Sequence, residues 1–139
     1  MKIALLGSLD FTDEIKKADD QLEKAGHEAV IPYSSRLILS GAMTLEEICA
    51  GGSAQKSKTD VIRYYYKELK QSDAVLALNR TKKGIENYIG ANTFLEIAFV
   101  HVLDKKIFLL HPIPNMEYLK DELEAMNQTV IHDDLSLIQ

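Results

Sequence analysis

Apolar runs and helical patterns alternate along this chain of 139 residues. Five short segments, most of them continuous apolar runs, are typical of strands that are buried in a sheet. They are bounded by glycine, proline or polar residues, which favour turns. The expected strands are Lys2–Leu6, Glu28–Ile31, Ala74–Leu78, Lys106–Leu110 and Thr129–Ile131.

Helical spacing of apolar residues separates these segments. One helix is expected from Phe11 to Ala25, ended by Gly26, and another carries Glu96 to about Leu103. Residues 33–59 are predicted to be irregular, apart from a short helix at Thr44–Ala50. The Gly51-Gly52-Ser53-Ala54 segment reads as a loop, Thr59 or Asp60 then caps a helix through Leu69, and an amphipathic stretch runs to about Met126.

The alternation of strands and helices predicts an α/β fold with a mostly parallel sheet and right-handed crossovers. Five strands fit a flavodoxin-like three-layer sandwich with the strand order 2-1-3-4-5. No repeat, low-complexity tract or linker interrupts the chain, so residues 1–139 are expected to form a single domain.

Composition excludes several classes of function. The net charge of −5 gives no basic surface for a nucleic acid polymer or an anionic membrane. The apolar runs are too short to span a bilayer, and the first one does not resemble a signal peptide. The single cysteine, Cys49, excludes an internal disulfide, and the four histidines lack ligand spacing. We therefore expect a cytoplasmic location and neither a metal nor a cofactor.

Candidate chemistry gathers where the parallel strands end, because ligands of such sheets bind beyond the carboxyl ends of the strands. Gly7 and Ser8 could cradle an anion with backbone N–H groups, or could form only a tight turn. Among the adjacent tyrosines Tyr64, Tyr65 and Tyr66, at least one is expected in the core, and another could stack on a base. Lys56 and Lys58 are either solvated or contact a phosphate. Polar side chains expected at this edge are Ser8, Asp10, Asn79, Asn87, Asn92, Thr93 and Glu96.

Glu96 is the most informative of these residues, because its neighbours in the sequence are almost all apolar. A buried carboxylate is costly unless it is paired or used. Thr93 and Glu96 have the T-x-x-E spacing of a capping box, so Glu96 either caps its own helix or does chemistry. A helix N-terminus also stabilises an anion, which predicts an ionised Glu96 that is able to act as a nucleophile.

Several segments resemble the nucleoside 2-deoxyribosyltransferases and their hydrolytic relatives, the deoxynucleoside 5′-monophosphate N-glycosidases. The resemblance covers most of the chain and is weakest at residues 33–59. It rests on Ser72-Asp73-Ala74-Val75-Leu76-Ala77-Leu78, Thr93-Phe94-Leu95-Glu96-Ile97-Ala98-Phe99 and Leu103-Asp104-Lys105-Lys106-Ile107, with Ile3-Ala4-Leu5-Leu6-Gly7-Ser8 and Gly26-His27-Glu28-Ala29-Val30-Ile31-Pro32 as a first βαβ unit.

The resemblance implies that Glu96 attacks the anomeric carbon of a 2-deoxynucleoside and forms a deoxyribosyl ester. A second base or water then accepts the sugar. The resemblance also implies a role for Asp73 in handling the base or the hydrogen bonds of the site. Where the family commonly has Asp or Ser, this chain has Gly90, and Asn87 or Asn92 could substitute for it. The implied partners are a nucleoside or nucleotide, a nucleobase and further copies of the chain, in a homodimer or higher homo-oligomer.

Glu124 lies in Leu123-Glu124-Ala125-Met126, which resembles a family segment that completes the site of a neighbouring subunit. There Glu124 would accept a 5′-hydroxyl and repel a 5′-phosphate, which favours a nucleoside over a nucleotide; otherwise it is a solvated helix residue. The family tyrosine on the first strand is replaced by Ala4 and Leu5, and its glycine after the nucleophile by Ala98. Two alternatives therefore stay open: a nucleoside- or nucleotide-binding domain without catalysis, and a structural protein in which Glu96 is only a cap.

Overall fold

Five parallel strands form the centre of the fold. In the computed structural model they are β1 (Lys2–Leu6), β2 (Glu28–Val30), β3 (Ala74–Ala77), β4 (Lys106–Leu109) and β5 (Thr129–Val130). Their order is β2-β1-β3-β4-β5, and every neighbouring pair is parallel. This confirms the predicted α/β fold and the flavodoxin-like strand order. Each predicted strand is present, and its ends fall within one residue of the prediction.

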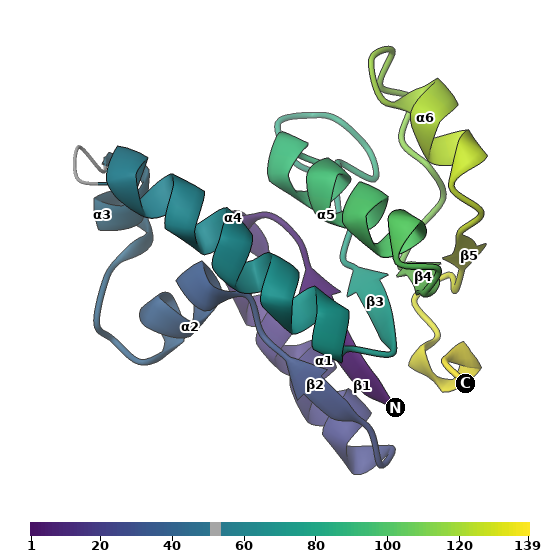
Figure 1. Cartoon of the computed structure of the whole chain (residues 1–139), viewed down its shortest axis with the longest axis horizontal. Helices are drawn as coiled ribbons and strands as arrows, with labels where there is room; N and C mark the ends of the chain where they lie inside the picture. The colour runs from purple at the N-terminus through teal and green to yellow at the C-terminus, as the bar shows by residue number, and fades with distance from the viewer. Residues whose placement is uncertain (51–53) are drawn as a thin grey trace.

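Helices cover both faces of the sheet and make three layers (Figure 1). Helix α1 (Thr12–Lys24) and the C-terminal 3-10 helix η2 (Leu135–Leu137) pack on one face. Helices α4 (Ala54–Gln71), α5 (Ala91–Val102) and α6 (Lys120–Ala125) pack on the other. The remaining helices are η1 (Leu9–Phe11), α2 (Tyr33–Leu39) and α3 (Leu45–Ala50).

The two halves of the core follow from the two-residue period of a strand. In β1, Ile3 and Leu5 point toward α1, whereas Ala4 and Leu6 point toward α4 and α5. All four side chains are fully buried. A run of apolar residues without polar alternation therefore fits this strand, since both of its faces are covered by helices.

The prediction of an irregular segment over residues 33–59 is wrong in two places. Helix α2 begins directly after Pro32, whose carbonyl accepts the first helical hydrogen bond, from Arg36 N–H at 2.9 Å. Helix α4 begins at Ala54, several residues before the predicted caps Thr59 and Asp60, because this stretch contains helix-forming Ala, Gln and Lys residues. The short helix predicted at 44–50 is confirmed as α3.

The structure describes the backbone of residues 1–50 and 54–139, and the side chains of residues 1–49 and 61–139. Of the loop predicted at 51–54, residues 51–53 lie outside the described residues, whereas Ala54 belongs to α4. The side chains of Lys56 and Lys58 also lie outside the described residues. Within the described part, no helix is long and apolar enough to cross a membrane. Within the same part, no three His, Cys, Asp or Glu side chains form a group that could hold a metal ion.

Candidate active site

A cleft of about 350 Å³ opens at the carboxyl end of the sheet. This volume is at the lower end of the range for small-molecule sites and suits one metabolite. Because β1 stands between β2 and β3, the loops that follow these strands meet at its carboxyl end. The cleft is lined by Gly7, Ser8, Leu9, Asp10, Pro32, Tyr33, Ser34, Cys49, Val61, Tyr65, Lys82, Tyr88, Gly90, Ala91, Asn92, Thr93 and Glu96.

Glu96 lies on the second turn of α5 and lines this cleft. Its side chain is half-buried, and burial raises its pKa from the ordinary 4.5 to about 8. No described group donates a hydrogen bond to its carboxyl, and no described cation pairs with it. Glu96 is therefore a largely protonated acid at neutral pH, and its ionised form is poorly stabilised.

This arrangement corrects two expectations about Glu96. Helix α5 begins at Ala91, with Gly90 as its N-cap and no side-chain capping bond, so Thr93 and Glu96 do not form the predicted capping box. The helix N-terminus also does not keep Glu96 ionised, because the carboxyl lies a turn beyond the free N–H groups and burial dominates. A capping box is present instead at α3, between Thr44 and Glu47.

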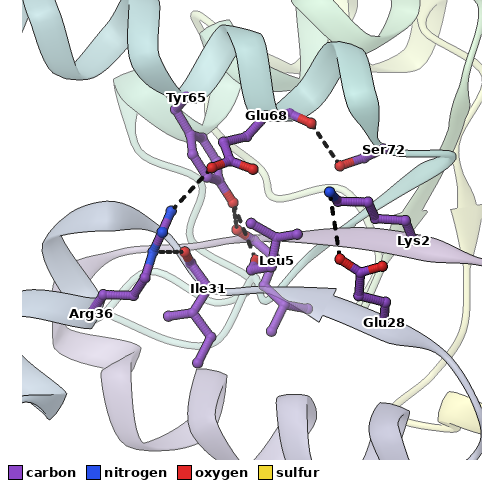
Figure 2. A network of polar contacts seen from close by, with 9 residues as sticks. Lys2, Leu5, Glu28, Ile31, Arg36, Tyr65, Glu68 and Ser72 are labelled. Carbon is purple, nitrogen blue, oxygen red and sulfur yellow. Dashed lines mark hydrogen bonds and ion pairs between the residues drawn. The ribbon is translucent and has the colours of Figure 1, made fainter.

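Tyr65 of α4 is buried, and its hydroxyl donates to the carbonyl of Leu5 at 2.5 Å (Figure 2). The N–H of Glu28 on β2 donates to the carbonyl of Met1 beside β1. In a parallel pair of strands, the next hydrogen bond of this kind lies two residues further along each strand. The paired residues end at Val30, and the next step of the ladder would bring residue 32 opposite the Leu5 carbonyl, where Pro32 has no N–H to donate. The Tyr65 hydroxyl replaces the missing donor, and this interaction fixes a neutral phenol in the cleft wall.

Burial keeps Tyr65 neutral, and polar contacts near it tie the cleft wall together. Burial, and then the nearby carboxylate of Glu96, raise the pKa of Tyr65 well above its usual value. Arg36 of α2 donates to the carbonyl of Ile31 at 2.8 Å and stands 3.7 Å from the carboxylate of Glu68 on α4. Figure 2 shows Arg36 between β2 and α4, so its contacts hold α2 beside the cleft.

Lys82 joins the loop after β3 to the loop after β1. Its Nζ donates to Ser8 Oγ at 2.6 Å, lies 3.1 Å from an oxygen of Asp10, and stands 5.4 Å from the ring centre of Tyr88. A bridge between Lys82 and Ile85 shapes the tight turn that presents this side chain. A cation is therefore held in the cleft by two of the predicted polar residues.

The structure brings together the predicted site residues Gly7, Ser8, Asp10, Gly90, Asn92 and Glu96, which all line the cleft. Gly90 packs beneath the ring of Tyr88, where a Cβ atom would lie 3.4 Å from the nearest ring carbon. A Cβ atom at position 90 would thus make an ordinary van der Waals contact with this ring.

The structure places Asp73 at the opposite, amino end of the sheet. Its carboxylate accepts from the backbone N–H of Lys2 at 2.7 Å, and its own N–H donates to the Lys2 carbonyl at 2.7 Å. The side chain is exposed and joins the start of β3 to the start of β1. Asp73 therefore makes a structural contact within its own chain and does not line the cleft that holds Glu96, and its role in the reaction stays a prediction.

Three further predicted residues also lie outside the cleft. Asn79 is buried, and its side-chain amide bonds the backbone of His111 and Pro112, so it joins the ends of β3 and β4. Asn87 is half-buried with φ 56°, in a left-handed conformation that asparagine tolerates. Glu124 is exposed on α6, and its contribution to the site of a neighbouring subunit stays a prediction.

The cleft residues that were not predicted from the sequence include Lys82, Tyr88, Tyr33 and Cys49. Lys82 and Tyr88 belong to the loop after β3, which was expected at this edge of the sheet. Their place in that loop could therefore have identified them as candidates. Tyr33 lies on α2, a helix that the sequence did not indicate. Cys49 is exposed on α3, and its place beside the cleft depends on how the chain returns from α2.

Comparison with known proteins gives distant likenesses among solved structures. No model of a known protein family matches the chain, and no curated protein matches it. The chain is similar to the solved structure of a CMP N-glycosidase, BcmB, from Clostridium botulinum, with 19% identity and a TM-score of 0.49. The match covers 94% of this chain and 85% of that one. Because the identity and the TM-score are this low, the fold is assigned from the strand order and the function is argued from the chemistry of the cleft.

Proposed function

We propose that this protein cleaves the N-glycosidic bond of 2-deoxynucleosides or their 5′-monophosphates, or transfers the sugar between bases, with Glu96 as the nucleophile. The observation that carries the proposal is one half-buried glutamic acid that faces a metabolite-sized cleft at the carboxyl end of the sheet. The sequence resemblance to the nucleoside 2-deoxyribosyltransferases around Glu96 supports the same reaction.

The reaction has two displacements at the anomeric carbon. An oxygen of ionised Glu96 attacks C1′, the bond between C1′ and the base nitrogen breaks, and its electron pair leaves with the base. The resulting deoxyribosyl ester is then attacked at C1′ by a second base or by water, and the ester electrons return to the Glu96 carboxylate. The departing base gains a proton, and the incoming base or water loses one, so the overall reaction is balanced.

Burial of Glu96 affects both steps. A poorly solvated carboxylate interacts more strongly with the positive charge that develops on the sugar, because the surroundings have a low dielectric constant. Only the ionised form attacks, so kcat/KM should rise about tenfold per pH unit below the pKa of about 8 and level off above it.

A raised pKa also suits an acid that protonates a departing base. In that role Glu96 must carry its proton, and kcat/KM should fall above pH 8 instead. The pH profile of kcat/KM therefore distinguishes the nucleophile from the proton donor.

The proposal is tested by incubating the protein with each 2-deoxynucleoside and each 5′-monophosphate, with and without a second free base, followed by chromatography. We expect free or exchanged base from the parent and at least a hundredfold loss of rate in Glu96→Gln. Glu122→Gln is the matched control, since Glu122 is an exposed glutamate on α6. Equal rates in the parent and in Glu96→Gln would refute the role of Glu96.

A second candidate is a domain that binds a nucleoside or nucleotide without turning it over. The place of Asp73, at the far end of the sheet, favours this alternative, because the cleft lacks that carboxylate. Binding in calorimetry without any released base, in the parent and at every pH from 6 to about 9, would support binding alone.

A further inference from the structure

Lys82 is the only cation among the described residues that line the cleft. Its Nζ donates to Ser8 Oγ at 2.6 Å and lies 3.1 Å from an oxygen of Asp10, so these contacts use two of its three hydrogens. No described residue accepts the third hydrogen. The side chain is 20% exposed, so water surrounds little of it. A charged donor is therefore available to a ligand in the cleft.

The neighbours of Lys82 hold its ammonium in one place. Ser8 and Asp10 belong to the loop after β1, and the ring centre of Tyr88 lies 5.4 Å from the Nζ atom on another side. The Asp10 carboxylate also balances the charge of the ammonium. A donor whose position is fixed before the reaction stabilises developing charge without any cost of reorganisation.

The proposed reaction requires such a donor, because an electron pair moves onto the base when its bond to C1′ breaks. Glu96 cannot stabilise that charge, since it is the nucleophile. Asp10 also lines the cleft, but as an anion it would oppose the charge. The hydroxyl of Tyr65 donates its only hydrogen to the Leu5 carbonyl. Lys82 is therefore the described cleft residue best suited to the departing base.

Lys82 and Glu96 also lie apart from each other. Glu96 is on α5 and Lys82 is in the loop after β3, and no ion pair joins them among the described residues. A cation beside Glu96 would lower the pKa of its carboxyl, whereas burial raises that pKa to about 8. Groups that act on the two sides of a glycosidic bond have to flank it, so a sugar can lie between these side chains.

We propose that Lys82 is a further catalytic residue, whose ammonium donates to the acceptor atom beside the glycosidic nitrogen of the departing base. That atom is O2 of a pyrimidine or N3 of a purine. The inference rests on the proposed function, in which Glu96 attacks the sugar in the same cleft.

The step is balanced without a proton from Lys82. The bond between a Glu96 oxygen and C1′ forms as the bond between C1′ and the base nitrogen breaks, and the base leaves as an anion that is hydrogen-bonded to Lys82. The anion then takes up the proton that the attacking water or second base releases. Ser8 and Asp10 are positioning residues in this step, because they act through Lys82.

The dependence of the rate on the leaving group tests this role. We compare kcat/KM for 2′-deoxyuridine and for 5-fluoro-2′-deoxyuridine, whose fluorine withdraws electrons and makes the base a better leaving group. Lys82→Met should lose at least about a hundredfold on 2′-deoxyuridine and much less on the fluorinated substrate. The ratio of the two kcat/KM values should therefore rise at least about tenfold over the parent.

Two other lysine variants serve as controls. Lys82→Arg keeps a charged donor, so its ratio should stay close to that of the parent. Lys83→Met, at an exposed lysine of the same turn, should change neither rate nor ratio. If urea unfolding shows that Lys82→Met is not folded, Ser8→Ala replaces it, and its ratio should rise in the same direction because Lys82 loses a contact.

The outcomes separate this inference from the proposed function. Glu96-dependent release of base, with equal losses on both substrates in Lys82→Met or with no loss at all, refutes the role of Lys82 and leaves the reaction standing. If the parent releases no base, the proposed reaction fails, and fluorine NMR titration with free 5-fluorouracil decides the contact. Binding that is weaker in Lys82→Met than in Lys83→Met then supports the contact between Lys82 and the base, and equal binding refutes it.

Discussion

The half-buried carboxyl of Glu96 makes the stability of this protein depend on pH. In the unfolded chain Glu96 ionises near 4.5, whereas burial raises its pKa in the folded protein to about 8. Between these values the folded state holds one proton more than the unfolded state. The free energy of unfolding therefore falls as pH rises from 4.5 to about 8, and the contribution of Glu96 stays constant above that value.

The size of this effect follows from the pKa. Each pKa unit corresponds to about 1.4 kcal/mol, so the rise from 4.5 to about 8 sets an upper limit of about 5 kcal/mol. Water in the cleft reaches part of the half-buried side chain and lowers this value. Glutamine has nearly the same shape and cannot ionise, so Glu96→Gln should be within about 1 kcal/mol of the parent in stability near pH 5. It should exceed the parent by several kcal/mol near pH 9.

Urea unfolding of the parent and of Glu96→Gln at unit steps from pH 5 to pH 9 measures this difference. Glu122→Gln should show no such trend, because Glu122 is exposed. A difference between parent and Glu96→Gln that stays flat over this range would show that Glu96 ionises normally. A parent that is the more stable protein at pH 9 would show that the carboxylate is stabilised by a partner.

Three further substitutions test the contacts that surround the cleft or separate residues from it. Tyr65→Phe removes the donor to the Leu5 carbonyl and should destabilise the fold by about 1–3 kcal/mol in urea unfolding, whereas Tyr66→Phe, at an exposed tyrosine, should change it little. Asp73→Asn should keep kcat/KM within about twofold of the parent, since Asp73 lies at the other end of the sheet; a loss of a hundredfold would place it in the reaction. Asn79→Ala should lower the free energy of unfolding by about 1–3 kcal/mol through its lost backbone contacts, with unchanged ligand affinity in calorimetry; weaker binding at equal stability would contradict this structural role.

The sheet could be predicted because each strand is a short apolar run whose two faces are covered, as β1 shows. Helix α2 could not, because its position depends on tertiary contacts. Ser35 pairs with the hydroxyl of Thr12 on α1 at 3.2 Å, and Arg36 reaches back to the carbonyl of Ile31. No local sequence pattern indicates either contact, and helix propensity alone did not predict a helix in this segment.

The candidate site also contains residues that the sequence could predict and residues whose roles depend on the fold. Glu96 could be identified because a lone carboxyl in an apolar stretch is unusual, but its pKa depends on burial that only the folded chain produces. Lys82 is an ordinary loop lysine in the sequence, and its role follows from the meeting of two loops at Ser8. Tyr65 acquires its role because Pro32 leaves the Leu5 carbonyl without a donor across two strands.

The most direct test of the proposed reaction is to trap the sugar on Glu96. The parent is mixed with a 2-deoxynucleoside or its 5′-monophosphate at pH 8.5, quenched in acid, digested and analysed by mass spectrometry. We predict one deoxyribosyl group, with its phosphate if present, on the peptide that contains Glu96, and none on that peptide in Glu96→Gln. Release of base without any adduct on Glu96, or with an adduct on another residue, would contradict the nucleophilic role of Glu96.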